Sequence, residues 1–355
     1  MTVKQPGTLA ELGAIEHYLD SPDTSGLLAL NFGFARARVL DTALELGVFT
    51  LLASESRDAT ALAEVLGCSH DGTERLLAAL VELGLLAETV TGHYAVTPAS
   101  EAYLVRGSAG YLGQHFAEVM GQWKRWESLT DVVRSGCSAG DLGDLQSRGA
   151  HSGMFAGNFL LTIRLAHQTA KQVQVPTGGR VLDFTAGGGE WGIALALRHP
   201  GVTCTAHDEP ALLSVARARV AEFGLSDRFS FVSADFAAPP FPDAHFDVIV
   251  LTQAGRFIGQ EAAGRLLHEC ARMLRPGGQV LIADILKNSS GNLASSRSML
   301  NLSLLVNTRR GRLLERSEYF ACLADAGLRP EREMTMGLVS VLIGTKGAET
   351  TCEEL

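Results

Sequence analysis

The second half of the chain alternates short apolar segments with helical stretches, and this alternation constrains the fold more than any other feature. Helical spacing of apolar residues is clearest at 211–223 and 262–274. Around these stretches lie five short apolar segments with the pattern of buried strands, at 180–184, 202–207, 229–232, 246–251 and 279–284. Strands that alternate with helices predict a parallel sheet covered on both faces. Ligands of such sheets bind at the carboxyl ends of the strands.

Carboxylates follow three successive strands of this predicted sheet. Asp183 ends the first strand, Asp208 closes the second, and Asp235 with Phe236 follows the third. Asp183 would repel a phosphate but suits an ammonium or sulfonium cation. Asp208 is placed to accept both hydroxyl groups of a ribose, while Asp235 and Phe236 offer a purine an acceptor and an aromatic face. Each residue alone could instead cap a helix or lie in the core, but the set predicts a nucleoside site.

A glycine-rich loop connects the first predicted strand to the next helix. Its glycines would let a ligand approach the backbone at the start of that helix. Gly187, Gly189 and Gly192 also fit the G-x-G-x-x-G pattern of dinucleotide-binding proteins, which alone is a weak signal. That pattern places its first glycine directly after the strand, with no charge facing the pyrophosphate, whereas Asp183 stands there in this chain. We therefore expect a nucleoside ligand and no dinucleotide.

The first part of the chain is predicted to be helical after a polar arm at residues 1–25. Apolar spacing predicts helices within 27–52, at 59–66 and at 71–83, followed by a hairpin around Thr91-Gly92. Helix, helix and hairpin form the outline of a winged helix. Between Leu51 and Ser100, two basic residues stand against seven acidic ones, which is the wrong balance for binding DNA. The long apolar helices favour dimerisation instead.

Composition excludes several classes of function. Thirty basic and 39 acidic residues in 355 leave a formal charge of −9, which argues against a nucleic-acid partner. No apolar run is long enough to span a bilayer, and the first residues lack the apolar core of a signal peptide. The six cysteines form no C-x-x-C pair and the ten histidines no H-x-x-x-H pair. We expect a soluble, cytoplasmic protein without a metal site or disulfides.

Taken in order, these motifs resemble a known family. Those of the sheet resemble class I S-adenosylmethionine-dependent methyltransferases: Val181-Leu182-Asp183, Asp208-Glu209-Pro210, Asp235-Phe236 and Arg275-Pro276-Gly277-Gly278. The first domain, with its segments 46–49 and 83–86, is similar to the dimerisation domain of small-molecule O-methyltransferases. These include the caffeate type, the hydroxyindole type and bacterial antibiotic-tailoring enzymes.

The resemblance implies an architecture and an assembly. It implies a Rossmann-like α/β sheet preceded by a mainly α winged-helix dimerisation domain. The chain would divide into an arm and winged helix at 1–100, a helical substrate-pocket region at 101–175 and a cofactor-binding domain at 176–355. The protein would be a homodimer that acts on a small molecule and has no nucleic-acid or membrane partner.

The resemblance also implies the cofactor and its ligands. S-adenosylmethionine would bind, with S-adenosylhomocysteine as the product. The loop from Gly187 to Gly189 would pass the methionine part, Asp208 with Glu209 would hold the ribose, and Asp235 with Phe236 the adenine; Thr252 and Gln253 would lie along the cofactor toward the substrate. The family usually has glycine where Thr185 stands, so a bulkier side chain is expected beside the cofactor.

The catalytic apparatus departs from the family pattern. Arg256 stands where the O-methyltransferases have their histidine base, and arginine stays protonated at neutral pH. Of the two acids that usually flank that histidine, one position is Asp284 and the other is Leu313. Arg256 either forms an ion pair with Asp284 or holds a negatively charged substrate that needs no base.

Two further explanations remain open at this stage. The base could come from elsewhere, with His115, His151 and His268 as candidates, or the fold could catalyse hydroxylation, decarboxylation or a pericyclic step while binding the cofactor. The candidate substrate contacts are Trp123, Phe155 and Thr308, and the two aromatic residues suggest a flat or ring-bearing molecule.

Overall fold

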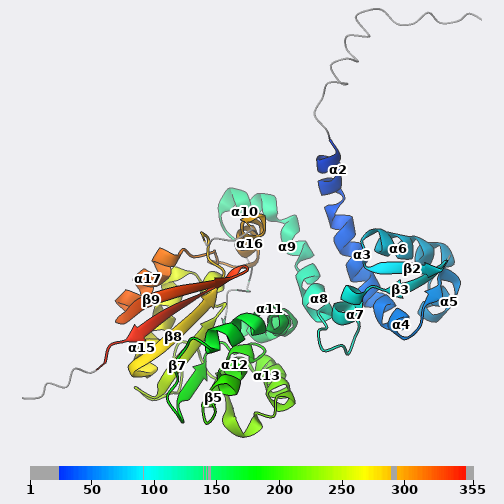
Figure 1. Ribbon diagram of the computed structural model, residues 1–355. Coiled ribbons are helices and arrows are strands. Elements are labelled where there is room, and N and C mark those ends of the chain that lie inside the picture. The colour runs from blue at the N-terminus through cyan, green and yellow to red at the C-terminus, as the bar shows by residue number, and fades with distance from the viewer. Residues whose placement is uncertain are drawn as a thin grey trace, which may run out of the picture. The chain divides into compact units, whose positions relative to one another are not determined.

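The computed structural model describes residues 24–90, 92–138, 140, 142, 145–288 and 294–348. The chain forms two compact units that divide between Ala109 and Gly110 (Figure 1). The predicted arm at 1–25 lies almost wholly outside the described residues. The helical region predicted at 101–175 contributes its first nine residues to the first unit and the rest to the second.

The first unit consists of helices around a three-stranded antiparallel sheet. The helices are α2 (Ser25–Asn31), α3 (Gly33–Leu46), α4 (Val48–Ser54), α5 (Ala59–Leu66), α6 (His70–Glu82) and α7 (Pro98–Leu104). The strands β1 (Arg57–Asp58), β2 (Leu86–Val90) and β3 (His93–Val96) pair in the order β1-β3-β2. Asp58 begins α5 by accepting a hydrogen bond from the Ala61 amide at 2.8 Å. Gly47, with a φ of 78°, separates α3 from α4.

A seven-stranded sheet forms the centre of the second unit. Its order is β6-β5-β4-β7-β8-β10-β9. The pairs from β6 to β8 are parallel, whereas β10 pairs antiparallel with both β8 and β9. The strands are β4 (Arg180–Asp183), β5 (Thr203–His207), β6 (Phe229–Val232), β7 (Phe246–Thr252), β8 (Leu274–Asp284), β9 (Leu328–Met336) and β10 (Val339–Lys346). After β4 the chain adds β5 and β6 on one side, and it then crosses to the other side of β4 to form β7. A ligand site is expected at this topological switch point between β4 and β7.

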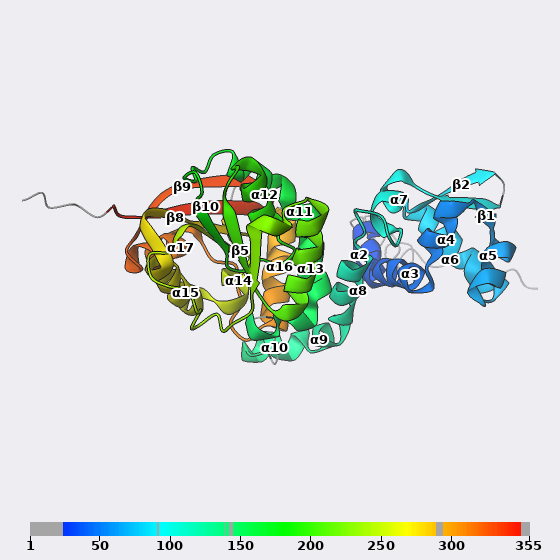
Figure 2. The ribbon, with the colours of Figure 1, turned by 90° about the horizontal axis from the view of Figure 1, so that it is seen from below.

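Helices cover both faces of this sheet (Figure 2). Figure 2 shows α11 (Ser152–Ala170), α12 (Glu190–Arg198) and α13 (Pro210–Glu222) together on one side. On the other side lie α15 (Gln260–Met273) and α17 (Arg316–Asp325). The remaining elements are α8 (Gly113–Gly121), α9 (Trp123–Glu127), α10 (Leu129–Ser135), η1 (Leu145–His151), η2 (Ser226–Arg228), α14 (Gly255–Ile258) and α16 (Ala294–Asn307).

The alternating side chains of β7 show why helices must pack on both faces of this sheet. Val248 and Val250 pack into the core that α11 and α12 share, whereas Ile249 and Leu251 pack into the core formed with α15 and α17. All four side chains are buried. A strand that is apolar on both sides is stable only between two layers, so the sequence 246–251 accounts for the three-layer arrangement.

Candidate functional site

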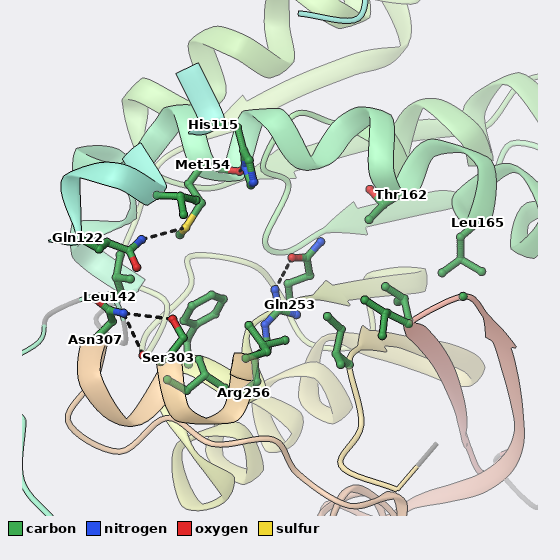
Figure 3. Close-up of a pocket in the computed structure, with 18 of the residues that line it drawn as sticks. His115, Gln122, Leu142, Met154, Thr162, Leu165, Gln253, Arg256, Ser303 and Asn307 are labelled. Atoms are coloured by element: carbon green, nitrogen blue, oxygen red, sulfur yellow. Dashed lines mark hydrogen bonds between the residues drawn. The ribbon is translucent and has the colours of Figure 1, made fainter. Parts of the chain in front are cut away.

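A cavity of about 630 Å³ opens in the second unit beside the carboxyl ends of the central strands (Figure 3). Its apolar lining residues come from several helices and from the β9–β10 turn, and include Leu142, Met154, Leu165, Phe257, Ile285, Leu300, Leu304, Leu338 and Val339. The polar lining residues are His115, Gln122, Thr162, Arg164, Gln253, Arg256, Ser303 and Asn307. Among the described residues that line it there is no carboxylate, so the cavity suits a largely apolar guest of neutral or negative charge.

Arg256 lies in the cavity wall and forms a buried ion pair. Its Nη1 donates to Asp284 Oδ1 at 2.6 Å, and its Nη2 donates to the side-chain oxygen of Gln253 at 2.5 Å. Asp284 also accepts hydrogen bonds from the Arg256 and Ile285 amides and from the Tyr319 hydroxyl. Burial, together with the negative charge of Asp284, raises the pKa of Tyr319 well above its usual value. The ion pair considered as one role of Arg256 is therefore present.

Thr185 and Thr252 join the ends of the neighbouring strands β4 and β7. The Thr185 hydroxyl donates to the Thr252 carbonyl at 2.9 Å and accepts from the Thr252 amide at 2.7 Å. The Thr252 hydroxyl donates in turn to the Thr185 carbonyl at 2.9 Å. These bonds hold the threonine side chain toward β7. The next residue, Gln253, has a φ of 51°, a left-handed backbone that costs a non-glycine residue about 1 kcal/mol.

Two buried carboxyl groups flank the glycine loop. Asp183 accepts the Gly192 amide at 2.9 Å, and Glu190 accepts the Thr162 hydroxyl at 2.9 Å. Burial raises the pKa of Asp183 to about 8 and that of Glu190 to about 7. Asp183 Oδ1 and Glu190 Oε2 have no hydrogen-bond partner within the described parts of the chain. Unpaired carboxyl oxygens in a buried site fit a ligand that carries positive charge.

The raised pKa of Asp183 makes a prediction about stability. Because the folded protein holds the proton more tightly than the unfolded chain, this group's stabilisation is complete below about pH 4 and is lost as the pH rises through about 8. Asp183→Asn keeps an acceptor for the Gly192 amide but cannot ionise. As the pH rises from about 4 to about 8, we expect its free energy of unfolding to increase relative to that of the wild type without ligand, by up to about 1 kcal/mol per pH unit. Urea unfolding at a series of pH values measures this, and parallel profiles for the two proteins would contradict it.

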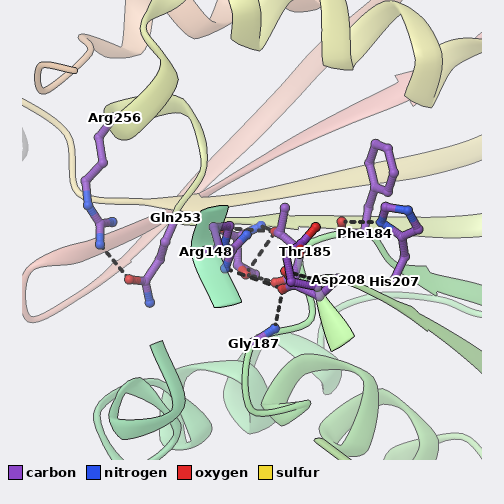
Figure 4. A network of polar contacts seen from close by, with 10 residues as sticks. Arg148, Phe184, Thr185, Gly187, His207, Asp208, Gln253 and Arg256 are labelled. Atoms are coloured by element: carbon purple, nitrogen blue, oxygen red, sulfur yellow. Dashed lines mark hydrogen bonds and ion pairs between the residues drawn. The ribbon is translucent and has the colours of Figure 1, made fainter. Parts of the chain in front are cut away.

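Asp208 lies at the end of β5 and binds the glycine loop (Figure 4). Its Oδ2 accepts the Gly187 amide and its Oδ1 the Glu209 amide, both at 2.9 Å. The guanidinium of Arg148, on η1, lies 3.5 Å from the same carboxylate and stacks on the Phe155 ring, 4.4 Å from its centre. Arg148 and Asp208 are both buried. A ribose hydroxyl that binds Asp208 would therefore compete with this guanidinium for the carboxylate.

The third predicted acid lies apart from this network. Asp235 is exposed and accepts the Ala237 amide at 2.8 Å. Phe236 is buried, and its ring packs edge-to-face against His207, with 4.6 Å between ring centres. Neither residue lines the cavity. Their assignment to adenine stays a prediction.

The three predicted substrate contacts have different surroundings. Phe155 is buried beneath Arg148, and Trp123 is 42% exposed in a surface groove with Trp126 and Met299. Thr308 is buried, donates to the Leu304 carbonyl at 2.7 Å and accepts the Gly311 amide at 2.7 Å. The cavity lining includes none of the three. It does include Met154 and Asn307, the immediate neighbours of Phe155 and Thr308.

The three histidines proposed as alternative bases lie in different places. His115 lines the cavity, whereas His268 lies on the surface, 3.0 Å from Asp325 Oδ2. His151 ends η1 and is not in the cavity lining. Arg148 on η1 and Met154 on α11 belong to no motif and reach the site through the packing of those elements. Glu190 lies within the predicted glycine loop, at the start of α12, but was not singled out as a site residue.

Other classes of site find no support in the described residues. No group of three or more His, Cys, Asp or Glu side chains within 24–90, 92–138, 140, 142, 145–288 and 294–348 is placed to hold a metal ion. In that same part of the chain, no helix is long and apolar enough to cross a membrane. Its five cysteines are free.

Comparison with known proteins agrees with this arrangement. Residues 28–106 match the O-methyltransferase dimerisation domain and residues 181–278 a methyltransferase domain. Curated relatives include acetylserotonin O-methyltransferase of Bos taurus, 30% identical over 84% of this chain and 91% of that protein. Another is 3-hydroxy-5-methyl-1-naphthoate 3-O-methyltransferase of Streptomyces sahachiroi, 29% identical over 90% of this chain and 94% of that protein.

Two solved methyltransferase structures are similar to this chain over most of its length. Human N-acetylserotonin methyltransferase, solved in complex with S-adenosylmethionine, superposes with a TM-score of 0.78 at 25% identity, over 93% of this chain and 99% of that one. The mitomycin 7-O-methyltransferase superposes with a TM-score of 0.74, also at 25% identity, over 96% of this chain and all of the other.

Proposed function

Since the chain belongs to the family of S-adenosylmethionine-dependent O-methyltransferases, we propose that it methylates an oxygen atom of a small secondary metabolite. Its cofactor is S-adenosylmethionine, and S-adenosylhomocysteine is the product. The observation that supports this function best is the pair of buried carboxyl groups, Asp183 and Glu190, each with one oxygen lacking a partner among the described residues beside the glycine loop. In their ionised form they attract the positive charge of this cofactor and repel a pyrophosphate, and a bound cation favours that ionised form.

The cofactor ligands follow from the same network. We propose that Gly187 and Gly189 approach the methionine part and that Asp208, with Glu209 next to it, accepts the ribose hydroxyls. Asp235 and Phe236 are assigned to the adenine, and Thr252 with Gln253 to the side facing the acceptor. Bound S-adenosylmethionine supplies a methyl group that its positive sulfur already activates, so the residues of this chain need only align the acceptor and remove its proton.

Arg256 replaces the family's histidine in this proposal and has a positioning role. Its guanidinium binds Asp284 and the side chain of Gln253, so it fixes the residue that follows β7 at the cavity. An arginine cannot accept the acceptor's proton. The proposal is therefore a methyl transfer in which the family's usual histidine takes no part.

The cavity indicates the kind of acceptor. Its apolar walls and its lack of a carboxylate among the described lining residues favour a flat, ring-bearing hydroxyl compound of neutral or negative charge. The relatives named for a hydroxynaphthoate and for acetylserotonin act on molecules of this type. We propose this class of acceptor for the protein.

We also propose that the protein acts as a homodimer in the cytoplasm. The match to a dimerisation domain begins within α2 and covers all of α3. Large apolar side chains of these two helices and of the residue between them are exposed in the single chain, namely Leu27, Leu28, Leu30, Phe32 and Phe34. An apolar surface of this kind is typical of a face that a second subunit covers.

Release of S-adenosylhomocysteine tests the function. The protein is incubated with S-adenosylmethionine and with hydroxynaphthoate or N-acetylserotonin as acceptor probe. We expect S-adenosylhomocysteine and methylated acceptor in equal amounts. An altered acceptor without loss of the cofactor's methyl group would instead support a hydroxylation, decarboxylation or pericyclic reaction on the same scaffold.

A further inference from the structure

His115 is held in the cavity wall with one ring nitrogen fixed. It lies on α8 and lines the cavity together with Gln253 and Arg256 (Figure 3). Its Nδ1 lies 3.2 Å from the Met154 carbonyl oxygen. Because a carbonyl oxygen can only accept a hydrogen bond, Nδ1 must carry the hydrogen. In the neutral ring, Nε2 then carries the lone pair and can accept a proton.

The first turn of α11 connects His115 to the glycine loop. The Met154 carbonyl oxygen accepts the hydrogen bond from His115. The carbonyl oxygen of the next residue, Phe155, lies 3.9 Å from the position that a Cβ atom on Gly187 would take. Two consecutive peptide groups therefore contact the histidine and the loop assigned to the methionine part of the cofactor. The imidazole is therefore joined, through one turn of α11, to the loop where the proposed function puts the methyl donor.

Packing between α8 and α11 fixes the position of the ring. The Glu118 carboxylate accepts the amides of Gly153 and Met154 at 2.7 and 2.9 Å, so Met154 is bound to α8 at both its amide and its carbonyl. A Cβ on Gly157 would approach the His115 Cβ to 2.7 Å. Only glycine allows this approach, so the histidine has little freedom to leave its place.

The charges near His115 leave the imidazole as the available base. Glu118 is occupied by the two amides of α11, and Arg256 by Asp284 and Gln253. Of the charged side chains on the elements around this part of the cavity, Arg164 on α11 lines it. Helix α9 carries Lys124, Arg125 and the exposed Glu127, none of which is in the cavity lining. A cation in the cavity lining stabilises an acceptor oxygen that is losing its proton.

We propose that His115 is the general base of the methyl transfer. This inference rests on the proposed function. Nε2 takes the proton of the acceptor hydroxyl as its O–H bond breaks, and the oxygen forms a bond to the methyl carbon. The carbon–sulfur bond breaks with its electron pair on sulfur, which gives S-adenosylhomocysteine. The imidazolium then releases its proton to solvent.

The variant His115→Asn tests the proposal. Asparagine keeps an N–H donor for the Met154 carbonyl but has no basic nitrogen. With hydroxynaphthoate as acceptor, we expect kcat to fall at least about 100-fold at neutral pH, while the Kd for S-adenosylhomocysteine stays within about twofold. The matched control is His268→Asn, which changes an exposed histidine and should keep the wild-type rate.

Two further readouts separate a base from a purely structural histidine. The wild-type rate should fall at acidic pH as the imidazole becomes protonated, and the Asn variant should lack this limb. With a nitro-substituted hydroxynaphthoate, whose hydroxyl is more acidic, the variant should lose much less activity.

An Asn variant that keeps the wild-type rate would overturn the role of His115 alone. If the variant does not fold, a wild-type rate independent of pH on the unsubstituted acceptor overturns it. No S-adenosylhomocysteine release by the wild type would instead overturn the proposed function and this inference with it.

Discussion

Replacing Arg256 by alanine is expected to lower the free energy of unfolding by about 3–5 kcal/mol. The side chains of Arg256 and Asp284 are only 7% and 1% exposed, and they are joined at 2.6 Å. The variant would leave the Asp284 carboxylate buried without its counter-ion, although the Tyr319 hydroxyl and two amides still donate to it. Urea unfolding monitored by circular dichroism measures the loss.

The control for this prediction is Arg265→Ala. Arg265 pairs with Glu261 at 2.8 Å on α15, but their side chains are 63% and 77% exposed, so the loss should stay below about 1 kcal/mol. The double variant Arg256→Met with Asp284→Asn removes both charges and should recover part of the lost stability. Equal losses for Arg256→Ala and Arg265→Ala would contradict a structural role for the buried pair.

Replacing Asp208 by asparagine is expected to weaken binding of S-adenosylmethionine about 30- to 150-fold. A charge-assisted hydrogen bond to a ribose hydroxyl contributes about 2–3 kcal/mol, and asparagine cannot accept at both positions. Calorimetric titration with S-adenosylhomocysteine measures the change. The exposed carboxylate Asp243, which pairs with Arg272, provides the control, and Asp243→Asn should bind like the wild type.

A variant of Arg148 is expected to change the affinity for the cofactor in the opposite direction. Its guanidinium lies 3.5 Å from the Asp208 carboxylate and competes with a ribose hydroxyl for that group. Arg148→Gln removes this competitor and should tighten cofactor binding roughly fivefold, which corresponds to about 1 kcal/mol. Wild-type affinity in Asp208→Asn, or weaker binding in Arg148→Gln, would contradict the assignment of the ribose to Asp208.

The fold was predictable where local sequence and tertiary packing agree. The five parallel strands were expected from their apolar runs and are confirmed, and α5 spans residues 59–66 as predicted, with Asp58 as its N-cap. The antiparallel strands β9 and β10 were not predicted. β9 carries Pro330 and several charged residues, as edge strands often do, and therefore lacks a buried-strand pattern. The predicted helical region 27–52 is divided at Gly47, whose positive φ ends α3.

The candidate site was only partly readable from the sequence. Asp183 and Asp208 follow strands, so the parallel sheet itself brings them to one edge. The ion pair of Arg256 with Asp284 was one of two roles expected from the motif alignment. Arg148 belongs to no motif, because its role depends on how η1 packs over the loop. Glu190 lies within the glycine pattern, but its contact with Thr162 depends on the packing of α11. No sequence pattern connects His115 to Met154, which follows it by 39 residues.

The most direct test of the account is a calorimetric titration of the wild-type protein with two ligands. The central claim is that the carboxylates at the ends of the parallel strands hold an adenosyl compound with a positive sulfur. We predict saturable binding of S-adenosylmethionine and no binding of nicotinamide adenine dinucleotide, whose pyrophosphate these carboxylates repel. Binding of the dinucleotide together with no response to S-adenosylmethionine would contradict the claim.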